Sequence, residues 1–336
     1  MIAGAALYLF YSAATAPAVC AGCHKAQART QPATPMGHAL ERVEDCDILR
    51  DHPRLTFQYG RYSYSITRQG SQGIYSVTDG TATLTVPIGW AFGLGEAGQT
   101  YVFERGGTFY ESRVSFYKAI GGLDLTMGAR AAEPQDLTQA AGREMIHKEV
   151  ADCFGCHTTG AVRGSTVHFE DLQAGVLCEN CHMQSAAHVA ALKAGDAKGA
   201  AMPHLAAMTT EESAEFCGRC HRTWAQIAAG GPLGILNIRF QPYRLTNSKC
   251  YDPTDQRISC IACHDPHVEV VRNTASYDSK CQACHYQRAN APGKVCPVAK
   301  KDCTGCHMPK LDLPGAHKKF TDHQIRIVRA NGAYPD

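Results

Sequence analysis

The sequence predicts a mainly α-helical and irregular chain that is interrupted by a small antiparallel β insert at about residues 55–118. Three observations support this fold class. The pattern Cys-x-x-Cys-His occurs seven times in 336 residues, and six of the seven copies lie after residue 150. The first two copies begin 133 residues apart, at Cys20 and Cys153, and strand-like alternation fills the gap. Around the later copies, long runs of helical periodicity are few.

The composition excludes several classes of protein. A formal charge of +2, with 19% charged residues and no basic tract interleaved with aromatic residues, does not fit a nucleic-acid-binding protein. The unusual feature is the presence of 17 Cys and 16 His. In a chain of this length, such a cysteine content is not typical of a small disulfide-stabilised domain. The role of these cysteines therefore has to be inferred from their spacing in the sequence.

The repeated motif is the attachment signature of c-type haem. Its two thiols form thioethers to the haem vinyl groups, and the adjacent His becomes the proximal iron ligand. A zinc site does not need the following His, and a redox dithiol needs one copy rather than seven. The sequence therefore predicts seven haem c groups. The attachment residues are Cys20, Cys23, Cys153, Cys156, Cys178, Cys181, Cys217, Cys220, Cys260, Cys263, Cys281, Cys284, Cys303 and Cys306. The proximal ligands are His24, His157, His182, His221, His264, His285 and His307.

The remaining nine His are candidates for the second axial position of each iron. They are His38, His52, His147, His168, His188, His204, His267, His317 and His323. Seven irons need at most seven of them, so every iron can be held by two His. Iron with two His ligands has no open position, so it moves electrons rather than binding a substrate. Met183 and Met308 directly follow proximal ligands and are expected to pack against haem instead of ligating iron.

The chain divides into four predicted segments, of which the first, residues 1–19, carries no charge. Haem of this type is attached after export, and Ala14-Thr15-Ala16 resembles the end of a leader peptide. The apolar run is short for a membrane span. Two alternatives stay open: a leader remnant, or a retained segment with membrane attachment through residues 1–16. Both predict an extracytoplasmic protein, whether periplasmic, membrane-anchored facing outward or extracellular.

Residues 20–54 form the first haem segment, and residues 55–130 form the β-rich insert. Residues 61–67 and 74–78 alternate apolar and polar side chains, and Asp79-Gly80 indicates a hairpin turn. A second hairpin is expected to turn at Gly106-Gly107. We interpret the insert as a structural cover for a haem, with a docking module as the alternative.

Residues 131–336 form the predicted six-haem domain, with helices expected at about residues 136–150, 188–195 and 209–229. With about 48 residues per haem (336/7), the chain has too few residues around each haem to form a conventional apolar core. The core is therefore expected to be filled by haem.

Three cysteines lie outside the motifs. Cys250 and Cys296 both lie in loop-like segments near proline, and we predict a disulfide between them. Cys46 would then be free, bridge to another chain, or be a buried thiol that packs as a small apolar group.

These motifs resemble the multihaem c-type cytochromes, the superfamily that includes the tetrahaem electron acceptor of hydroxylamine oxidoreductase. Cys-Glu-Asn-Cys-His followed by Ser-Ala-Ala-His at residues 178–188 carries the resemblance, as do residues 260–267 and 303–323. It covers residues 150–330 well and residues 24–40 more weakly, and it does not extend to the β insert. The resemblance implies closely packed haems whose distal His come from other motif neighbourhoods. By this analogy the distal ligands are His38, His188, His267, His317 and His323, then His52 and His147, with His168 and His204 in reserve.

Three functions follow from this interpretation. The first is electron transfer along seven haems, as an anchored relay or a polymerised conduit, with redox proteins or further copies of the chain as partners and with no catalytic residue. The second is a multihaem oxidoreductase acting on a small nitrogen or sulfur compound at one open haem. Pentahaem nitrite reductases use Cys-x-x-Cys-Lys for this purpose, and the chain lacks that motif. The third is a structural or sensory role. The supply of His favours the first.

Overall fold

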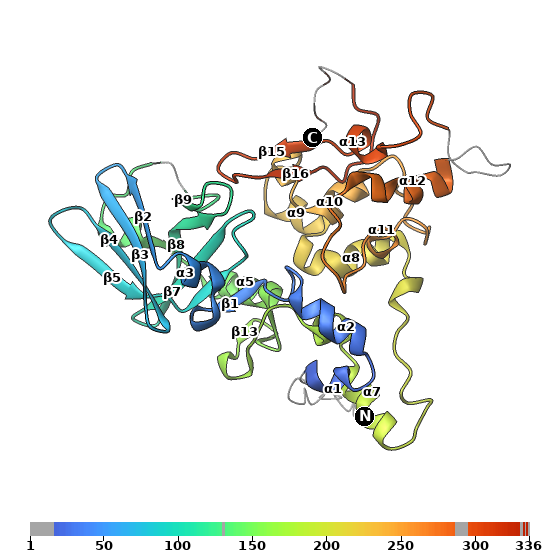
Figure 1. The fold of residues 1–336 in the computed structure, drawn as a ribbon, viewed down its shortest axis with the longest axis horizontal. Helices are drawn as coiled ribbons and strands as arrows, with labels where there is room; N and C mark the ends of the chain where they lie inside the picture. Colours follow the sequence, from blue (N-terminus) through green and yellow to red (C-terminus); the bar gives the residue numbers. More distant parts are fainter. Residues whose placement is uncertain (1–16, 130–131, 286–294, 330–331, 333, 335–336) are drawn as a thin grey trace, which may run out of the picture. The chain divides into compact units, whose positions relative to one another are not determined.

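The computed structural model describes residues 17–129, 132–285, 295–329, 332 and 334 (Figure 1). Its contacts divide the chain into two compact units. One unit joins Met1–Leu40 to Ile146–Pro203, and the other joins Glu41–Met145 to His204–Asp336. Each of the four predicted segments is continuous in the sequence, whereas each unit joins two separate stretches of the chain. The predicted segment boundaries therefore stay predictions. The predicted leader or anchor at residues 1–16 lies outside the described residues.

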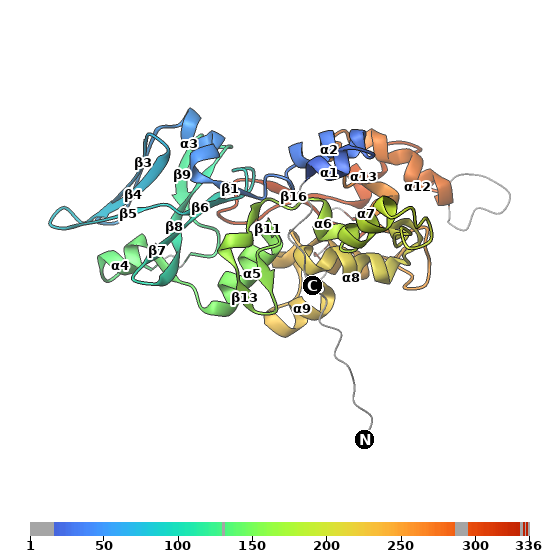
Figure 2. The same cartoon turned by 90° about the horizontal axis from the view of Figure 1, so that it is seen from below.

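The second unit contains two antiparallel sheets. The four-stranded sheet has its strands in chain order: β2 (Arg54–Tyr59), β3 (Tyr62–Gln69), β4 (Gln72–Thr78) and β5 (Thr83–Pro87). Figure 2 shows β3, β4 and β5 as long neighbouring strands. The other sheet has the order β1-β6-β7-β8-β10, with β9 also paired to β8. Its strands are β1 (Leu40–Arg42), β6 (Trp90–Phe92), β7 (Gln99–Arg105), β8 (Thr108–Tyr117), β9 (Gly122–Leu125) and β10 (Gly142–Glu144).

Both predicted hairpins are confirmed. Asp79 lies in the turn between β4 and β5, where its carboxylate accepts the backbone N–H groups of Thr81 and Ala82. Gly106 and Gly107 alone join β7 to β8, with φ of +60° and +80°. A two-residue turn of this type needs positive φ at both positions, which glycine adopts without steric cost.

The sheets enclose an apolar core made of protein side chains. Alternate residues of β3 point inward, so Tyr62, Tyr64 and Ile66 are buried, and Tyr75 and Phe103 join them from β4 and β7. Aromatic side chains of this size contribute most to such a core because each buries a large apolar area. The β region extends past the predicted end at residue 118, to Glu144, and the described chain is a mixed α and β fold. The predicted mainly α class and haem-filled core are therefore not confirmed for this part of the chain.

Cys46 belongs to this β core. It is 0% exposed, and its Sγ donates to Oε1 of the buried Gln99 at 3.3 Å. Burial raises the pKa of the Cys46 thiol to about 11, because the thiolate would lose its hydration. The structure therefore favours the buried thiol over a bridge to another chain.

An alkylation experiment checks this placement. In the native protein, iodoacetamide is expected to leave Cys46 unlabelled, since the reagent attacks an accessible thiolate. After unfolding without reductant, Cys46 should be labelled, whereas Cys250 and Cys296 should stay unlabelled if their predicted disulfide forms. Rapid labelling of Cys46 in the native protein would contradict its burial.

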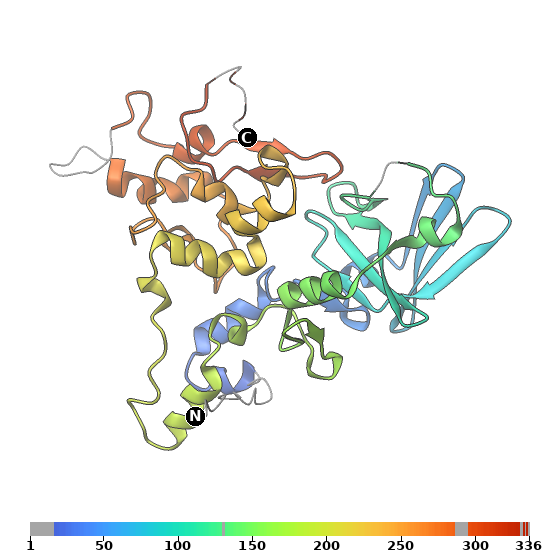
Figure 3. The same cartoon turned by 180° about the vertical axis from the view of Figure 1, so that it is seen from behind.

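Short helices and loops form the rest of the second unit (Figure 3). They are α3 (Asp47–Asp51), α4 (Leu137–Ala141), α8 (Thr210–His221), α9 (Trp224–Gly230), α10 (Gln241–Thr246), α11 (Cys260–Cys263), α12 (Asp278–His285) and α13 (Cys303–His307). The 3-10 helices are η2 (Val43–Asp45), η4 (Leu205–Ala207), η5 (Ile235–Asn237) and η6 (Thr274–Tyr277), and β15 (Lys310–Asp312) pairs with β16 (Lys319–Thr321).

The predicted helix at residues 209–229 is two helices. α8 begins with a capping box, in which Thr209 accepts from the backbone of Glu212 and the Glu212 carboxylate accepts from the backbone of Thr209. It ends at Arg222, whose φ of +63° no helix continues. Thr223 then caps α9 in the same way with Gln226.

The first unit contains α1 (Pro17–Ala21), α2 (Lys25–Thr30), η1 (Gln31–Ala33), α5 (His147–His157), η3 (Phe169–Asp171), α6 (Cys178–Cys181) and α7 (Ser185–Lys193). Its two small sheets pair β11 (Thr158–Thr159) with β14 (Gln173–Ala174), and β12 (Val162–Arg163) with β13 (Thr166–Val167). The helix expected at residues 136–150 is replaced by α4, β10 and the start of α5, and the helix expected at 188–195 corresponds to α7.

A close backbone contact holds the two chain segments of the first unit together. The side-chain amide of Gln31 donates to the backbone carbonyl of Val176 at 2.7 Å, and the backbone N–H of Val176 donates to the carbonyl of Met36 at 2.8 Å. At Gly175, a Cβ would lie only 1.8 Å from the carbonyl oxygen of Gly37, so this approach requires glycine. The contact brings the first and third motifs into one unit.

Among the described residues, no helix combines the length and the apolar character that a membrane crossing needs.

Candidate haem sites

Each Cys-x-x-Cys-His motif lies on a short helix or at its end. The helices are α1 with the residues that follow it, α5, α6, α8, α11, α12 and α13, in motif order. In three motifs the same hydrogen bond closes the turn, from the N–H of His24, His182 or His264 to the carbonyl of the first cysteine four residues earlier. A helical turn places residues three and four apart on one face. Both thiols and the His of a motif are thus presented to the same side, as haem attachment requires.

Two proximal His are oriented by backbone carbonyls. Nδ1 of His157 lies 2.8 Å from the oxygen of Ala39, and Nδ1 of His307 lies 2.8 Å from the oxygen of Arg326. In each case Nδ1 donates, which leaves the lone pair of Nε2 for a metal. Burial lowers the pKa of His157 against the smaller effect of this hydrogen bond. The neutral ring that remains is the form that ligates iron.

Two pairs of His rings lie at the separation that one metal ion needs. The ring centroids of His24 and His188 are 6.4 Å apart, and those of His264 and His323 are 6.2 Å apart. Two imidazoles on opposite sides of one metal ion, each with a metal–nitrogen distance of about 2 Å, have centroids about 6 Å apart. The residues present therefore fit an iron between each pair.

The second ring of each pair is also oriented by a backbone carbonyl. Nδ1 of His188 lies 2.5 Å from the oxygen of Ala200, and Nδ1 of His323 lies 3.1 Å from the oxygen of Thr321. Both rings therefore keep Nε2 for the metal. His188 follows the third motif but lies beside the proximal His of the first, and His323 follows the seventh but lies beside that of the fifth.

A buried ion pair positions His323. Asp322 and Arg244 are both 0% exposed, with Arg244 Nε and Nη2 donating to the two carboxylate oxygens at 2.9 and 3.0 Å. Arg326 Nη1 adds a third donor at 2.6 Å. The Ser248 hydroxyl donates to the carbonyl of His323 at 2.7 Å. Sequence reasoning missed this pair, because 78 residues separate its two members and no local pattern links them.

In the first unit, neighbouring motifs contact one another through their helical turns. The Cys178 sulfur lies beside that of Cys20, which joins the third motif to the first. The Asn180 side chain donates to the carbonyl of Thr158 at 2.9 Å, which joins the third motif to the residue after His157. The motifs of this unit thus follow one another in the order second, third, first.

In the second unit the contacts follow the sequence. The Cys260 sulfur lies near that of Cys217, Cys263 lies near Cys281, and Cys281 lies near Cys303. Asp278 fixes the last step by accepting the backbone N–H groups of Asp302 and Cys303 at 2.8 and 2.9 Å. The fourth to seventh motifs therefore form a continuous series.

His317, predicted as a distal ligand, is engaged elsewhere. Its Nε2 lies 2.7 Å from the carboxylate of Asp124 in β9, and its ring packs on Tyr117 with centroids 4.7 Å apart. The nitrogen that would ligate iron is thus hydrogen-bonded to an acid. We therefore leave His317 out of the ligand set proposed below.

The remaining candidates have different surroundings. His52 packs on Phe116 of the β core at 4.8 Å, and Nδ1 of His267 lies 3.0 Å from the Asp265 carboxylate. His147 and His204 are exposed, and His38 is half-buried. Their roles as ligands stay predictions.

His168, a reserve candidate, lies in a small polar cluster. Its Nδ1 is 3.2 Å from Glu170, and the possible ligand atoms of His168, Glu170 and Asp171 lie within 4.8 Å of one another. Arg163, however, already pairs with Asp171 at 2.5 Å. The arrangement is that of a surface ion-pair cluster.

Cys250 and Cys296 are free thiols in this structure. Cys250 is half-buried, and burial raises the pKa of its thiol. The predicted Cys250–Cys296 disulfide therefore stays a prediction.

Comparisons with known proteins indicate the class of protein. Residues 121–183 match the family described as cytochrome c554 and c-prime. High-molecular-weight cytochrome c of Nitratidesulfovibrio vulgaris (strain Hildenborough) is 24% identical over 198 residues, which are 56% of this chain and 30% of that protein. The chain thus spans less than a third of the length of this curated relative.

A solved structure is also similar. The crystal structure of the outer cell wall cytochrome OcwA matches with a TM-score of 0.53 and 14% identity, over 93% of this chain and 79% of that chain. At this identity the likeness concerns the fold. Together with the matched family and the curated relative, it supports a multihaem c-type cytochrome.

Proposed function

We propose that this chain transfers electrons along seven covalently bound c-type haems, most of them held by two His. The observation that carries the proposal is the spacing of two His pairs, His24 with His188 and His264 with His323, each at the separation of two axial ligands on one iron. When bound, haem iron supplies a one-electron couple between the ferric and ferrous states. The protein supplies the attachment, the axial ligands and the surroundings that set the potential.

These contacts support a proposed set of iron ligands. The seven motif His are the proximal ligands, with His188 and His323 as distal ligands to the first and fifth irons. His38, His52, His147 and His267 are candidates for the others, with His204 and His168 in reserve. Because a backbone hydrogen bond at Nδ1 leaves Nε2 of His188 and of His323 open, these two rings are oriented before the metal binds.

The contacts between motifs support a relay rather than isolated redox centres. Adjacent attachment points bring neighbouring haems close, in the order second, third, first in one unit and fourth to seventh in the other. Such a series would accept an electron at one member and release it at another. Redox proteins or further copies of the chain are the proposed partners.

We place the protein outside the cytoplasm, because c-type haem is attached there and because one similar structure is that of an outer cell wall cytochrome. The proposal includes no catalytic residue. The alternative, an oxidoreductase acting on a small nitrogen or sulfur compound, needs one iron without a distal ligand.

Voltammetry of the protein adsorbed on an electrode separates these functions. The relay predicts a reversible signal whose integrated charge corresponds to seven electrons per chain, unchanged by nitrite or hydroxylamine. A catalytic current with either compound would contradict the relay and support the oxidoreductase.

A further inference from the structure

Residues 322–326 contact the candidate ligands of two different irons. One of them, His323, belongs to the segment and lies opposite His264 of the fifth motif, with ring centroids 6.2 Å apart. At the other end of the segment, the backbone carbonyl of Arg326 lies 2.8 Å from Nδ1 of His307, the His of the seventh motif. The backbone N–H of Arg326 also donates to the carbonyl of His307 at 3.3 Å. Five consecutive residues thus join the fifth motif to the seventh.

Asp322 fixes the shape of this segment from within. Its carboxylate accepts the backbone N–H of Gln324 at 2.9 Å and Nη1 of Arg326 at 2.6 Å. The same Nη1 donates to the carbonyl of Gln324 at 2.8 Å. All three hydrogen bonds lie within five residues, so the backbone between His323 and Arg326 cannot change shape without breaking one of them. A displacement at one end is therefore passed to the other.

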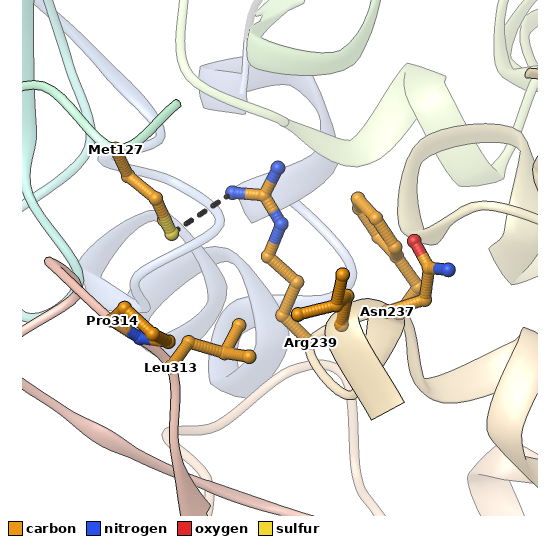
Figure 4. A pocket seen from close by; sticks show the side chains of 7 residues that line it. Met127, Asn237, Arg239, Leu313 and Pro314 are labelled. Carbon is orange, nitrogen blue, oxygen red and sulfur yellow. Dashed lines mark hydrogen bonds between the residues drawn. The ribbon is translucent and has the colours of Figure 1, made fainter. Parts of the chain in front are cut away.

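The ion pair that anchors the segment is enclosed by protein. Arg244 donates from Nε and Nη2 to the two carboxylate oxygens of Asp322, and both side chains are 0% exposed. Figure 4 shows a cavity walled by residues next to the same elements: Leu313 and Pro314 precede β16, and Phe240 precedes α10. Arg244 and Asp322 are not among the described residues that line it. A paired contact of this kind fixes the orientation of the carboxylate as well as its position.

Ser248 is a second, uncharged anchor of the same segment. Its hydroxyl donates to the carbonyl of His323 at 2.7 Å and accepts the N–H of Ile325 at 2.9 Å. The N–H of Lys249 adds a hydrogen bond to the carbonyl of Ile325 at 3.1 Å. Together with the ion pair, these contacts hold the backbone on both sides of His323.

We propose that residues 322–326 orient the distal ligand of the fifth iron and the proximal ligand of the seventh iron together, with Arg244 and Ser248 as positioning residues for both. The inference rests on the proposed function, because it requires haem at these two motifs. In both ligands Nδ1 donates to a backbone carbonyl, of Thr321 for His323 and of Arg326 for His307.

The direction of the effect follows from these two hydrogen bonds. A fixed acceptor at Nδ1 makes an imidazole a more basic ligand and sets the plane of its ring. A more basic nitrogen favours ferric over ferrous iron, so the held segment lowers the reduction potential of the fifth and seventh haems. Loosening the segment should therefore make both haems easier to reduce.

Ser248→Ala tests the proposal without a change of charge. In a redox titration of the holoprotein, two of the seven components should move to higher potential, each by about a tenfold change in its reduction equilibrium. This change is ~59 mV for one electron. Arg244→Lys, which keeps the charge and loses the paired hydrogen bonds, should move the same two components in the same direction. Thr246→Ala is the matched control, because its hydroxyl donates to the carbonyl of Tyr243 at 2.8 Å within α10, and it should move none.

Two marker variants identify the components. His323→Ala removes the distal ligand of the fifth iron, and Cys303→Ser combined with Cys306→Ser removes the seventh attachment site. In the His323→Ala background, Ser248→Ala should still shift one other component. That component should be the one that the double serine variant lacks.

Low-temperature electron paramagnetic resonance gives a second readout, because the g-values of low-spin ferric iron depend on the angle between the two imidazole planes. The signals of the same two haems should change in Ser248→Ala. With seven haems bound, unchanged potentials and signals in Ser248→Ala and Arg244→Lys, or changes confined to one haem, would overturn this inference alone. Shifts spread over all seven haems would indicate a general loosening of the fold and would also overturn it. A haem count below seven in the unmodified protein would instead contradict the proposed function.

Discussion

Replacing Asp322 with alanine is expected to lower the free energy of unfolding by about 3–5 kcal/mol. Arg244 is 0% exposed and loses the carboxylate that binds its Nε and Nη2. A buried guanidinium without a partner is strongly unfavourable, because it has lost its hydration and gained nothing in return. Since Asp322 immediately precedes His323, the same change should also loosen this proposed distal ligand.

Guanidinium chloride titration, followed by the haem absorbance, measures this effect. Asp312→Ala is the matched control in the same segment, because Asp312 forms an exposed ion pair with Lys319 at 3.7 Å. Exposed pairs of this kind contribute about 0–1 kcal/mol, so the control should change little. Equal midpoints for the two variants would mean that the buried pair does not stabilise the fold.

The dependence of the free energy of unfolding on pH, on the acid side, gives a second test of the Asp322 carboxylate. Burial raises the pKa of Asp322, but hydrogen bonds from Arg244, from the Gln324 N–H and from Arg326 outweigh it, so the pKa lies below its ordinary value. The folded pKa is thus below the unfolded one, and the stabilisation is complete above the unfolded pKa. It is lost as the pH falls through the folded pKa. Asp322→Asn should therefore show a smaller loss of stability on acidification.

Replacing His323 with alanine is expected to convert one haem in seven from six-coordinate low-spin to high-spin iron. His323 lies opposite His264 at a centroid separation of 6.2 Å, and its Nε2 is left open by the hydrogen bond of Nδ1 to Thr321. Alanine cannot ligate iron, so that position becomes open to water or to an added ligand. Electron paramagnetic resonance of the oxidised variant measures the change.

His317→Ala is the matched control, since this His lies six residues earlier and is engaged by Asp124. All of its haems should stay low-spin. Added imidazole should return His323→Ala to the low-spin state, which a misfolded protein would not do. A high-spin signal in His317→Ala, or none in His323→Ala with seven haems bound, would reverse the assignment of these two residues.

The candidate attachment sites could be predicted from the sequence because their residues are adjacent in the chain. A Cys-x-x-Cys-His motif needs only one helical turn, so each of the seven candidate proximal sites is encoded locally. The hairpins at Asp79-Gly80 and Gly106-Gly107 are local in the same sense.

Long-range contacts were not predictable in this way. The pairing of His24 with His188 joins residues 164 positions apart, and Arg244 joins Asp322 across 78. The helix expected at residues 209–229 was wrong for a different reason. Two capping threonines, Thr209 and Thr223, lie within one apolar run, and the second starts a new helix. The β region exceeds its predicted bounds because β9 and β10 are short and pair with the edge of β8.

The central claim is that seven haems are bound and that no iron has an open position for a substrate. Electron paramagnetic resonance of the fully oxidised, unmodified protein at low temperature, with haem quantified per chain, tests it most directly. The relay predicts seven haems per chain and low-spin signals that account for all of them. A stoichiometric high-spin signal that shifts with nitrite or hydroxylamine, or a count below seven, would contradict it.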